Sequence, residues 1–218
     1  EPRAEMYQTD LETAHLTDRS SNELFRDLRA ACESGWDFSS RWLRDPQNLT
    51  TIHTTDIIPV DLNCLLYHLE TTLVKGYEQL QENYMNSYFK KKAANRKNLI
   101  LEYCWDEEKG FFMDYDFVKK ERKDVFSLAG MFPLFFKIAT PEQAKSCAKI
   151  IEKQFLMDGG VISTVNTTDQ QWDAPNGWAP LQWITIKGLR NYGFDDLANQ
   201  IKDRWVKLNT KVYKKTPL

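Results

Sequence analysis

The fold class is decided by residues 60–83, which read VDLNCLLYHLETTLVKGYEQLQEN. Apolar residues recur there at steps of three and four: Leu62, Leu65, Leu66, Leu69, Leu73, Val74, Tyr77 and Leu80. This period is that of an amphipathic α-helix. A second helical pattern follows over 87–104, and its predicted inward-facing positions are Tyr88, Leu99, Ile100 and Tyr103. Two such helices in succession predict a helical hairpin.

Other helices are marked by their ends. Thr140-Pro141-Glu142-Gln143 predicts a helix start, because Thr140 can cap, Pro141 suits the first turn and Gln143 completes a capping box. That helix should end near Phe155, where Asp158-Gly159-Gly160 turns the chain. Further helices are expected over 9–16, 21–33, 124–137, 181–192 and 195–213. The best strand candidate, 52–60, contains a proline, which disfavours a central strand. The sequence therefore predicts an all-α fold.

A loose repeat indicates how the hairpins are arranged. The dipeptide Trp-Asp occurs at Trp36-Asp37, Trp105-Asp106 and Trp172-Asp173, at steps of 69 and 67 residues. Each dipeptide lies where helical periodicity gives way to a loop, and two helices with their connections fill such a period. Hairpins of this size stacked around an axis form an α/α toroid, in which the loops at one end line a common cavity.

Composition excludes several classes of function. Of the 218 residues 42% are hydrophobic, and the net charge is −2, with 29 Lys and Arg against 31 Asp and Glu. Such a balance argues against nucleic acid or an anionic membrane as a partner. No apolar run reaches the length of a membrane span. The sequence starts at Glu1 without Met, so it leaves the compartment undetermined: periplasmic, secreted and cytoplasmic proteins all remain possible.

Four cysteines lie too far apart in the sequence to be a metal or redox motif: Cys32, Cys64, Cys104 and Cys147. Each lies in an apolar helical stretch, so buried thiols are the preferred interpretation, and disulfides remain an alternative. No metal site is predicted.

The segment Glu33-Ser34-Gly35-Trp36-Asp37-Phe38-Ser39-Ser40-Arg41-Trp42 directly follows a predicted helix. Glycoside hydrolysis needs a protonated carboxylic acid beside the leaving oxygen. Apolar neighbours such as Trp36 and Phe38 would desolvate Asp37 and favour its protonated form. The alternative is structural: Asp37 caps a local turn, and Arg41 pairs with Glu33.

Two further segments also combine carboxylates with aromatic residues. In Gln170-Gln171-Trp172-Asp173-Ala174-Pro175-Asn176-Gly177-Trp178-Ala179-Pro180, prolines and a glycine fix an irregular backbone lined by indoles and amides. Such a loop suits a sugar, because amides bind hydroxyls and an indole stacks on the ring; a helix-entry loop with buried Trp anchors is the alternative. The segment 105–116 has charges and Gly110 that fit a hairpin connection, so a structural role is preferred there.

The segments 33–42 and 170–180 closely resemble the trehalase family of inverting glycosidases. Residues 171–180 resemble one of its two signatures in full, and Thr54-Thr55-Asp56-Ile57-Ile58-Pro59-Val60-Asp61-Leu62-Asn63 resembles the family between them. The resemblance runs over nearly all of 1–218. It implies an (α/α)6 toroid, of which this chain is an incomplete segment truncated at both ends of a single catalytic domain. It also implies α,α-trehalose as the substrate, two glucose products and no cofactor.

The resemblance also implies roles for individual residues. Asp37 matches the general acid, and Gly35 matches a position that contacts substrate through its backbone. The stretch Pro2-Arg3-Ala4-Glu5 resembles an Arg-x-Glu pair that grips glucose hydroxyls, which makes Arg3, Ala4 and Glu5 candidate substrate contacts. Trp172 matches a Trp beside the sugar, and Gln171 precedes it in the signature.

The sequence departs from the family's pattern at both ends. The other signature, a Pro-Gly-Gly-Arg stretch, is absent, and so is the glycine-rich run that precedes the family's catalytic Glu. We therefore expect the base to lie outside this sequence and the 218-residue chain to be inactive by itself. Two alternatives remain. One is another α/α-toroid carbohydrate enzyme, such as a glucosidase or an epimerase, and the other is a sugar-binding remnant without a base.

Overall fold

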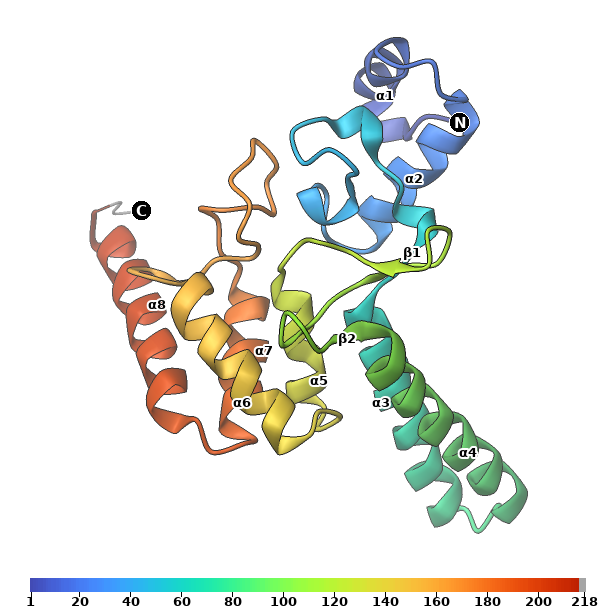
Figure 1. Cartoon of the computed structure of the whole chain (residues 1–218), viewed down its shortest axis with the longest axis vertical. Helices are drawn as coiled ribbons and strands as arrows, with labels where there is room; N and C mark the ends of the chain where they lie inside the picture. The colour runs from blue at the N-terminus through green and yellow to red at the C-terminus, as the bar shows by residue number, and fades with distance from the viewer. Residues whose placement is uncertain (216–218) are drawn as a thin grey trace.

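A computed structural model of the chain describes residues 1–215 and confirms the all-α class (Figure 1). The described residues form eight α-helices: α1 (Tyr7–His15), α2 (Ser21–Glu33), α3 (Val60–Gln79), α4 (Asn83–Leu99), α5 (Phe132–Phe135), α6 (Pro141–Ile150), α7 (Ala179–Arg190) and α8 (Asp195–Lys215). No helix within 1–215 combines the length and apolar character that a membrane span needs.

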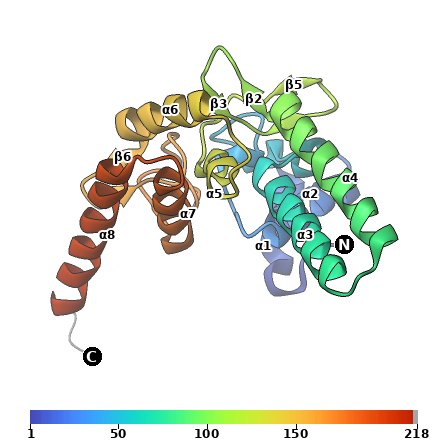
Figure 2. The same cartoon turned by 90° about the horizontal axis from the view of Figure 1, so that it is seen from below.

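Six of the helices follow one another as three successive pairs, α3–α4, α5–α6 and α7–α8, and the helices of the first and third pairs pack on each other. Helix α5 packs against both α3 and α7, so the pairs stand side by side. Figure 2 shows them along an arc, with α3, α5 and α7 on its inner side and α4, α6 and α8 on its outer side. This arrangement is a segment of an α/α toroid, as the sequence predicted.

The helix ends follow local chemistry. The Thr140 hydroxyl accepts from the Gln143 amide while the Gln143 side chain accepts from the Thr140 amide, which confirms the predicted capping box of α6. Helices α4 and α6 both end in a π-helical turn, Ile100–Cys104 and Ile151–Phe155. A β-hairpin of two-residue strands follows each turn: β2 (Trp105–Asp106) with β3 (Phe111–Phe112), and β6 (Leu156–Met157) with β7 (Gly160–Val161).

This correspondence corrects the predicted repeat. Trp105-Asp106 begins the hairpin after α4, but the equivalent position after α6 is Leu156-Met157, and Trp172-Asp173 lies in the loop beyond it. The inner helices begin at Val60, Phe132 and Ala179, so the steps are 72 and 47 residues. The predicted period near 68 residues is therefore wrong for the second step, because a short α5 and a long loop divide the chain unequally.

The predicted helix over 124–137 is also mostly wrong. Residues Leu128–Met131 form a 3-10 turn and only Phe132–Phe135 are α-helical. The backbone before them is extended and pairs with the loop after β7: Ser127 bridges Thr164, and the Leu128 amide donates to the Ser163 carbonyl at 2.9 Å. Tertiary pairing thus replaces the local helix.

A three-stranded sheet joins the first third of the chain to the middle. Strand β1 (Ile57–Ile58), inside the stretch considered as a strand, pairs antiparallel with β4 (Tyr115–Asp116), which pairs with β5 (Glu121–Arg122). The described part also contains 3-10 turns at Ala4–Met6, Ser40–Trp42, Leu49–Thr51 and Thr54–Asp56.

The apolar core is continuous from α2 to α8. Three cysteines, Cys64, Cys104 and Cys147, are buried and Cys32 is half-buried; none of these thiols, all within the described residues, forms a disulfide. Of the positions in 87–104 predicted to face inward, only Ile100 is buried, whereas Tyr88, Leu99 and Tyr103 are exposed. Tyr103 packs edge-on against Tyr115 of β4, with ring centroids 5.0 Å apart.

Candidate active site

The candidate site begins where α2 ends. Gly35 has φ +78°, and its amide donates to the Cys32 carbonyl at 3.0 Å, which ends the helix in a left-handed turn. A Cβ added at Gly35 would meet nothing within 4 Å, so the glycine is required by its backbone conformation and leaves the peptide open to solvent. The turn directs the chain into residues 36–42.

Three indoles stack across the two predicted sugar-site segments. The ring centroids of Trp36 and Trp172 lie 5.0 Å apart at an interplanar angle of 35°, and those of Trp172 and Trp178 lie 4.5 Å apart at 15°. Trp36 is buried, whereas the other two are half-buried. The segments 33–42 and 170–180 therefore form one cluster.

Asp173 ties the two segments by hydrogen bonds. Its Oδ1 accepts from the Ser39 and Thr164 hydroxyls, both at 2.8 Å. Its Oδ2 accepts from the Ser40 amide at 2.8 Å and from the Thr168 hydroxyl at 2.6 Å. The side chain is fully buried. A carboxylate with four donors in a buried position holds structure and has no access to a substrate.

Arg41 anchors the same loop from the other side. Its guanidinium makes two hydrogen bonds to Asp61 at the start of α3 and two to Asp114 before β4, at 2.6 to 2.8 Å. It also lies over the rings of Trp36 and Trp42, at 4.8 and 4.4 Å from their centroids. The sequence alternative of an Arg41–Glu33 pair is therefore wrong.

The buried ion pairs shift the pKa values of their members. Burial alone would lower the pKa of Arg41, but the neighbouring carboxylates Asp114 and Asp61 outweigh it and raise that pKa well above its usual range. Burial alone would raise the pKa of Asp61, but Arg41 outweighs it and lowers that pKa. Arg41 and Asp61 are thus both charged at neutral pH.

Asp37 differs from its neighbours because it is exposed. Trp36, Ser39 and Ser40 on either side are buried, and Phe38 is half-buried. The expectation that Trp36 and Phe38 desolvate the Asp37 carboxylate is therefore wrong within the described residues: Trp36 packs on Trp172, the Phe38 ring lies beside the Arg3 guanidinium, and Asp37 stays exposed. The outcome is a carboxylate presented to solvent from a rigid loop.

Arg3 lies close to this loop. Its guanidinium stands 5.1 Å from the centroid of the Phe38 ring and donates to the Cys32 sulfur at 2.9 Å. Its main partner is the buried Asp10, which accepts from Arg3 Nη2 at 2.6 Å and from Nε at 3.0 Å. Hydrogen bonding to Asp10 raises the pKa of Arg3. Arg3 is itself buried, and its contacts with Asp10 and with the Phe38 ring hold the N-terminal segment against the loop that carries Asp37.

The remaining predicted residues are exposed. Ala4 and Glu5 lie in the 3-10 turn after Arg3, and Gln171 lies beside Trp172, where its carbonyl accepts from the Asn176 side chain at 3.2 Å. Sequence reasoning did not assign the partners Asp10, Asp61 and Asp114. Asp61 and Asp114 are in segments already quoted, but only the fold shows that both face one arginine.

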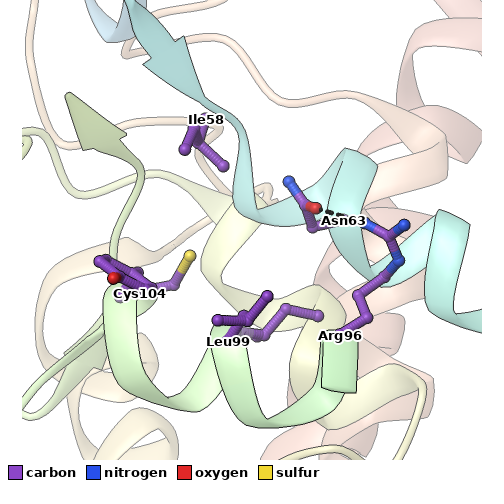
Figure 3. A pocket seen from close by; sticks show the side chains of 7 residues that line it. Ile58, Asn63, Arg96, Leu99 and Cys104 are labelled. Carbon is purple, nitrogen blue, oxygen red and sulfur yellow. Dashed lines mark hydrogen bonds between the residues drawn. The ribbon is translucent and has the colours of Figure 1, made fainter. Parts of the chain in front are cut away.

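An apolar pocket lies apart from Asp37. It is a pocket of about 190 Å³ between β1, the first turn of α3 and the end of α4, and the close view shows its mainly apolar lining (Figure 3). Arg96 at its edge donates to Asn63 at 2.9 Å and forms a bidentate pair with Glu70. With its polar groups already paired, this pocket does not suit a sugar. Within residues 1–215 no cluster of His, Cys, Asp and Glu would hold a metal ion.

Comparisons with known proteins place these features in context. The model of a family described as trehalase matches residues 1–217. The structure is similar to neutral trehalase Nth1 from Saccharomyces cerevisiae, with a TM-score of 0.79 and 26% identity, over 97% of this chain and 40% of that one. It is also similar to a GH63 mannosylglycerate hydrolase from Thermus thermophilus, with a TM-score of 0.60 and 25% identity, over 71% and 38% of the two chains. The chain thus spans about two fifths of the length of these two proteins.

Proposed function

The chain belongs to the trehalase family, and from that premise we propose that it is part of a single (α/α)6 catalytic domain that hydrolyses α,α-trehalose to two glucose molecules. We propose further that the reaction inverts the anomeric configuration and that Asp37 is its general acid. No cofactor is required for this chemistry, because two carboxyl groups and a water suffice.

One observation carries the role of Asp37. Within residues 36–40 it is the one exposed side chain, and the backbone around it is fixed by the indole stack, by Asp173 and by Arg41. A general acid must stand at a defined point beside the leaving oxygen and must be reachable by the substrate. A carboxylate on a rigid, exposed loop beside aromatic rings meets both conditions.

The neighbouring residues suit substrate contacts. The exposed peptide at Gly35 can hydrogen-bond a sugar hydroxyl, and the half-buried face of Trp172 can pack against a pyranose. Gln171 adds an exposed amide next to this ring. Glu5 and the backbone of Ala4 follow Arg3, whose position under Phe38 brings this N-terminal turn to the same loop.

We propose that the catalytic base is contributed from outside these 218 residues. Inversion needs a second carboxylate roughly 6.5–9.5 Å from the acid, with room for a water between them. Asp173 accepts four hydrogen bonds and is buried, so it cannot bind that water. Glu33 is an exposed residue at the last position of α2, before the turn at Gly35, and we assign it no part in the reaction.

A related reaction is the second candidate. The similarity to a mannosylglycerate hydrolase favours a glycosidase on a different small glycoside, but it covers less of this chain than the similarity to the trehalase does. A sugar-binding remnant without a base is the non-enzymatic alternative. Parallel assays of the full-length protein with trehalose and with mannosylglycerate separate the three, since a remnant would hydrolyse neither.

The test of the acid is Asp37→Asn in the full-length protein. The amide keeps the size of the side chain but cannot donate a proton as an acid, so glucose release from trehalose should fall by about 10²–10⁴-fold. Glu33→Gln is the matched control, four residues away and also exposed, and it should stay within a few-fold of the unmodified protein. Activity of Asp37→Asn close to that of Glu33→Gln would show that another group is the acid. The unmodified 218-residue chain, assayed beside them, should release no glucose.

A further inference from the structure

We infer that Asp173 is a positioning residue that sets the place of Asp37, an inference that rests on the proposed role of Asp37 as the acid. Asp173 lies 133 and 134 residues along the chain from the two serines that it binds, and these serines are the second and third residues after Asp37. It therefore reaches the acid's loop from the far segment of the cluster.

The contacts of Asp173 are directional. The Ser40 amide can only donate, so it requires an acceptor at Oδ2, where the Thr168 hydroxyl also donates at 2.6 Å. The Ser39 hydroxyl donates to Oδ1 and itself accepts from the Arg41 amide at 3.1 Å. This chain of bonds fixes the backbone of Ser39 and Ser40 relative to the loop 164–173.

Two neighbouring contacts act in the same sense. The Trp172 amide donates to the Phe38 carbonyl at 2.9 Å, and the Trp172 ring packs on Trp36. Residues 36, 38, 39 and 40 are thus each in contact with the segment 164–173, whereas Asp37, which lies between them, makes no hydrogen bond to it. Loss of Asp173 would leave the acid on a loop free to shift.

Substitutions at Asp173 should separate positioning from folding. Asp173→Ala removes all four acceptor contacts. Asp173→Asn keeps one oxygen, which can face the Ser40 amide, and presents its NH₂ group to the Ser39 and Thr164 hydroxyls, which can turn to accept. We therefore expect the asparagine variant to recover a large part of what the alanine variant loses.

The experiment compares two substrates in the full-length protein. Trehalose needs a protonated leaving group, whereas α-D-glucosyl fluoride releases fluoride without an acid. Asp173→Ala should lower kcat for trehalose by about 10²-fold, as a misplaced catalytic group does, with KM changed only a few-fold. For the fluoride, kcat should stay within about threefold, because the acid contributes little there. The alkaline limb of the kcat–pH profile for trehalose should move in the same variant, since that limb reports the acid.

Asp27→Ala is the matched control. Asp27 is also buried and accepts hydrogen bonds from Arg19 and from the amide and hydroxyl of Thr55, but it has none of its bonds to residues 36–40. If this variant loses activity only because its structure is disturbed, kcat should fall by the same factor for trehalose and for α-D-glucosyl fluoride. Equal losses on both substrates in Asp173→Ala would overturn the inference.

Two further measurements keep the test decisive. If Asp173→Ala does not fold, Ser39→Ala removes one of the four bonds and should show the same substrate split in a weaker form; an equal loss on both substrates would again refute positioning. The near-ultraviolet circular dichroism of the packed indoles Trp36 and Trp172 reports the loop without any substrate. It should change in Asp173→Ala and persist in Asp27→Ala, even if the unmodified protein proves not to hydrolyse trehalose.

Discussion

Replacement of Arg41 by methionine should destabilise the fold by about 4 to 6 kcal/mol. Removing one member of a buried ion pair costs about 3–5 kcal/mol, because the remaining charge stays buried without a partner. Here the remaining charges are Asp114, whose side chain is 1% exposed, and Asp61, whose side chain is 12% exposed. The substitution also removes the cation that lies over the rings of Trp36 and Trp42, which adds about 1 kcal/mol to the loss of stability.

The assay is urea unfolding of the unmodified and Arg41→Met proteins, followed by far-ultraviolet circular dichroism. The pH dependence distinguishes charge from packing. The lowered pKa of Asp61 means that its contribution in the unmodified protein is lost only at strongly acidic pH. In the variant, a buried carboxylate without a cation takes up a proton more readily. The difference in the free energy of unfolding between the two proteins should therefore become smaller as the pH falls from about 7.5 to about 5.

Two results would refute this reasoning. One is a loss below about 1 kcal/mol at neutral pH, which is the value of an exposed ion pair. The other is a loss that does not depend on pH, which would mean that packing and not charge is responsible. The triple variant Arg41→Met, Asp61→Asn, Asp114→Asn should recover part of the stability, because it leaves no unpaired charge.

The remaining predictions concern a glycine pair and a histidine. Gly35→Ala should lower the free energy of unfolding by about 1 kcal/mol, because alanine is strained at positive φ. Gly76→Ala should raise it by about 0.5–1 kcal/mol, since Gly76 lies in α3 with open space around it. Chemical denaturation of both variants checks the pair, and changes of the same sign in the two free energies would contradict it. Burial, with Lys123 and Arg44 nearby, lowers the pKa of His53 to about 4, so the unfolded chain binds a proton there first and stability should fall as the pH drops from about 6.5 to about 4. His53→Gln should flatten that slope in unfolding curves measured across the range, and an unchanged slope would assign it to other groups.

The helices were predictable because their signals are local. The spacing of apolar residues in 60–83 and the capping box at Thr140 act over single turns, and both predictions are confirmed. The helix over 124–137 failed because Ser127 and Leu128 pair with a segment about 35 residues away, which no local pattern contains. The spacing of the Trp-Asp dipeptides failed as a repeat because loop lengths are not set by helix periodicity.

The candidate site was only partly predictable, for the same reason. The two segments rich in Trp were visible in the sequence, and the fold brings them together. The roles of Asp173 and Arg41 were not visible, since each depends on partners that only the tertiary structure supplies: Ser39 and Ser40 for the first, Asp61 for the second. The exposure of Asp37 likewise depends on how its neighbours pack.

The bonds between Ser39, Ser40 and Asp173 also bear on the order in which the molecule forms. Closing a loop of about 130 residues costs more chain entropy than forming any single hairpin, so contacts of this span form late. During synthesis, the loop 36–42 leaves the ribosome long before the residues that fix it. The loop that carries Asp37 can therefore acquire its final shape only after the segment 164–173 has been synthesised and has packed against it.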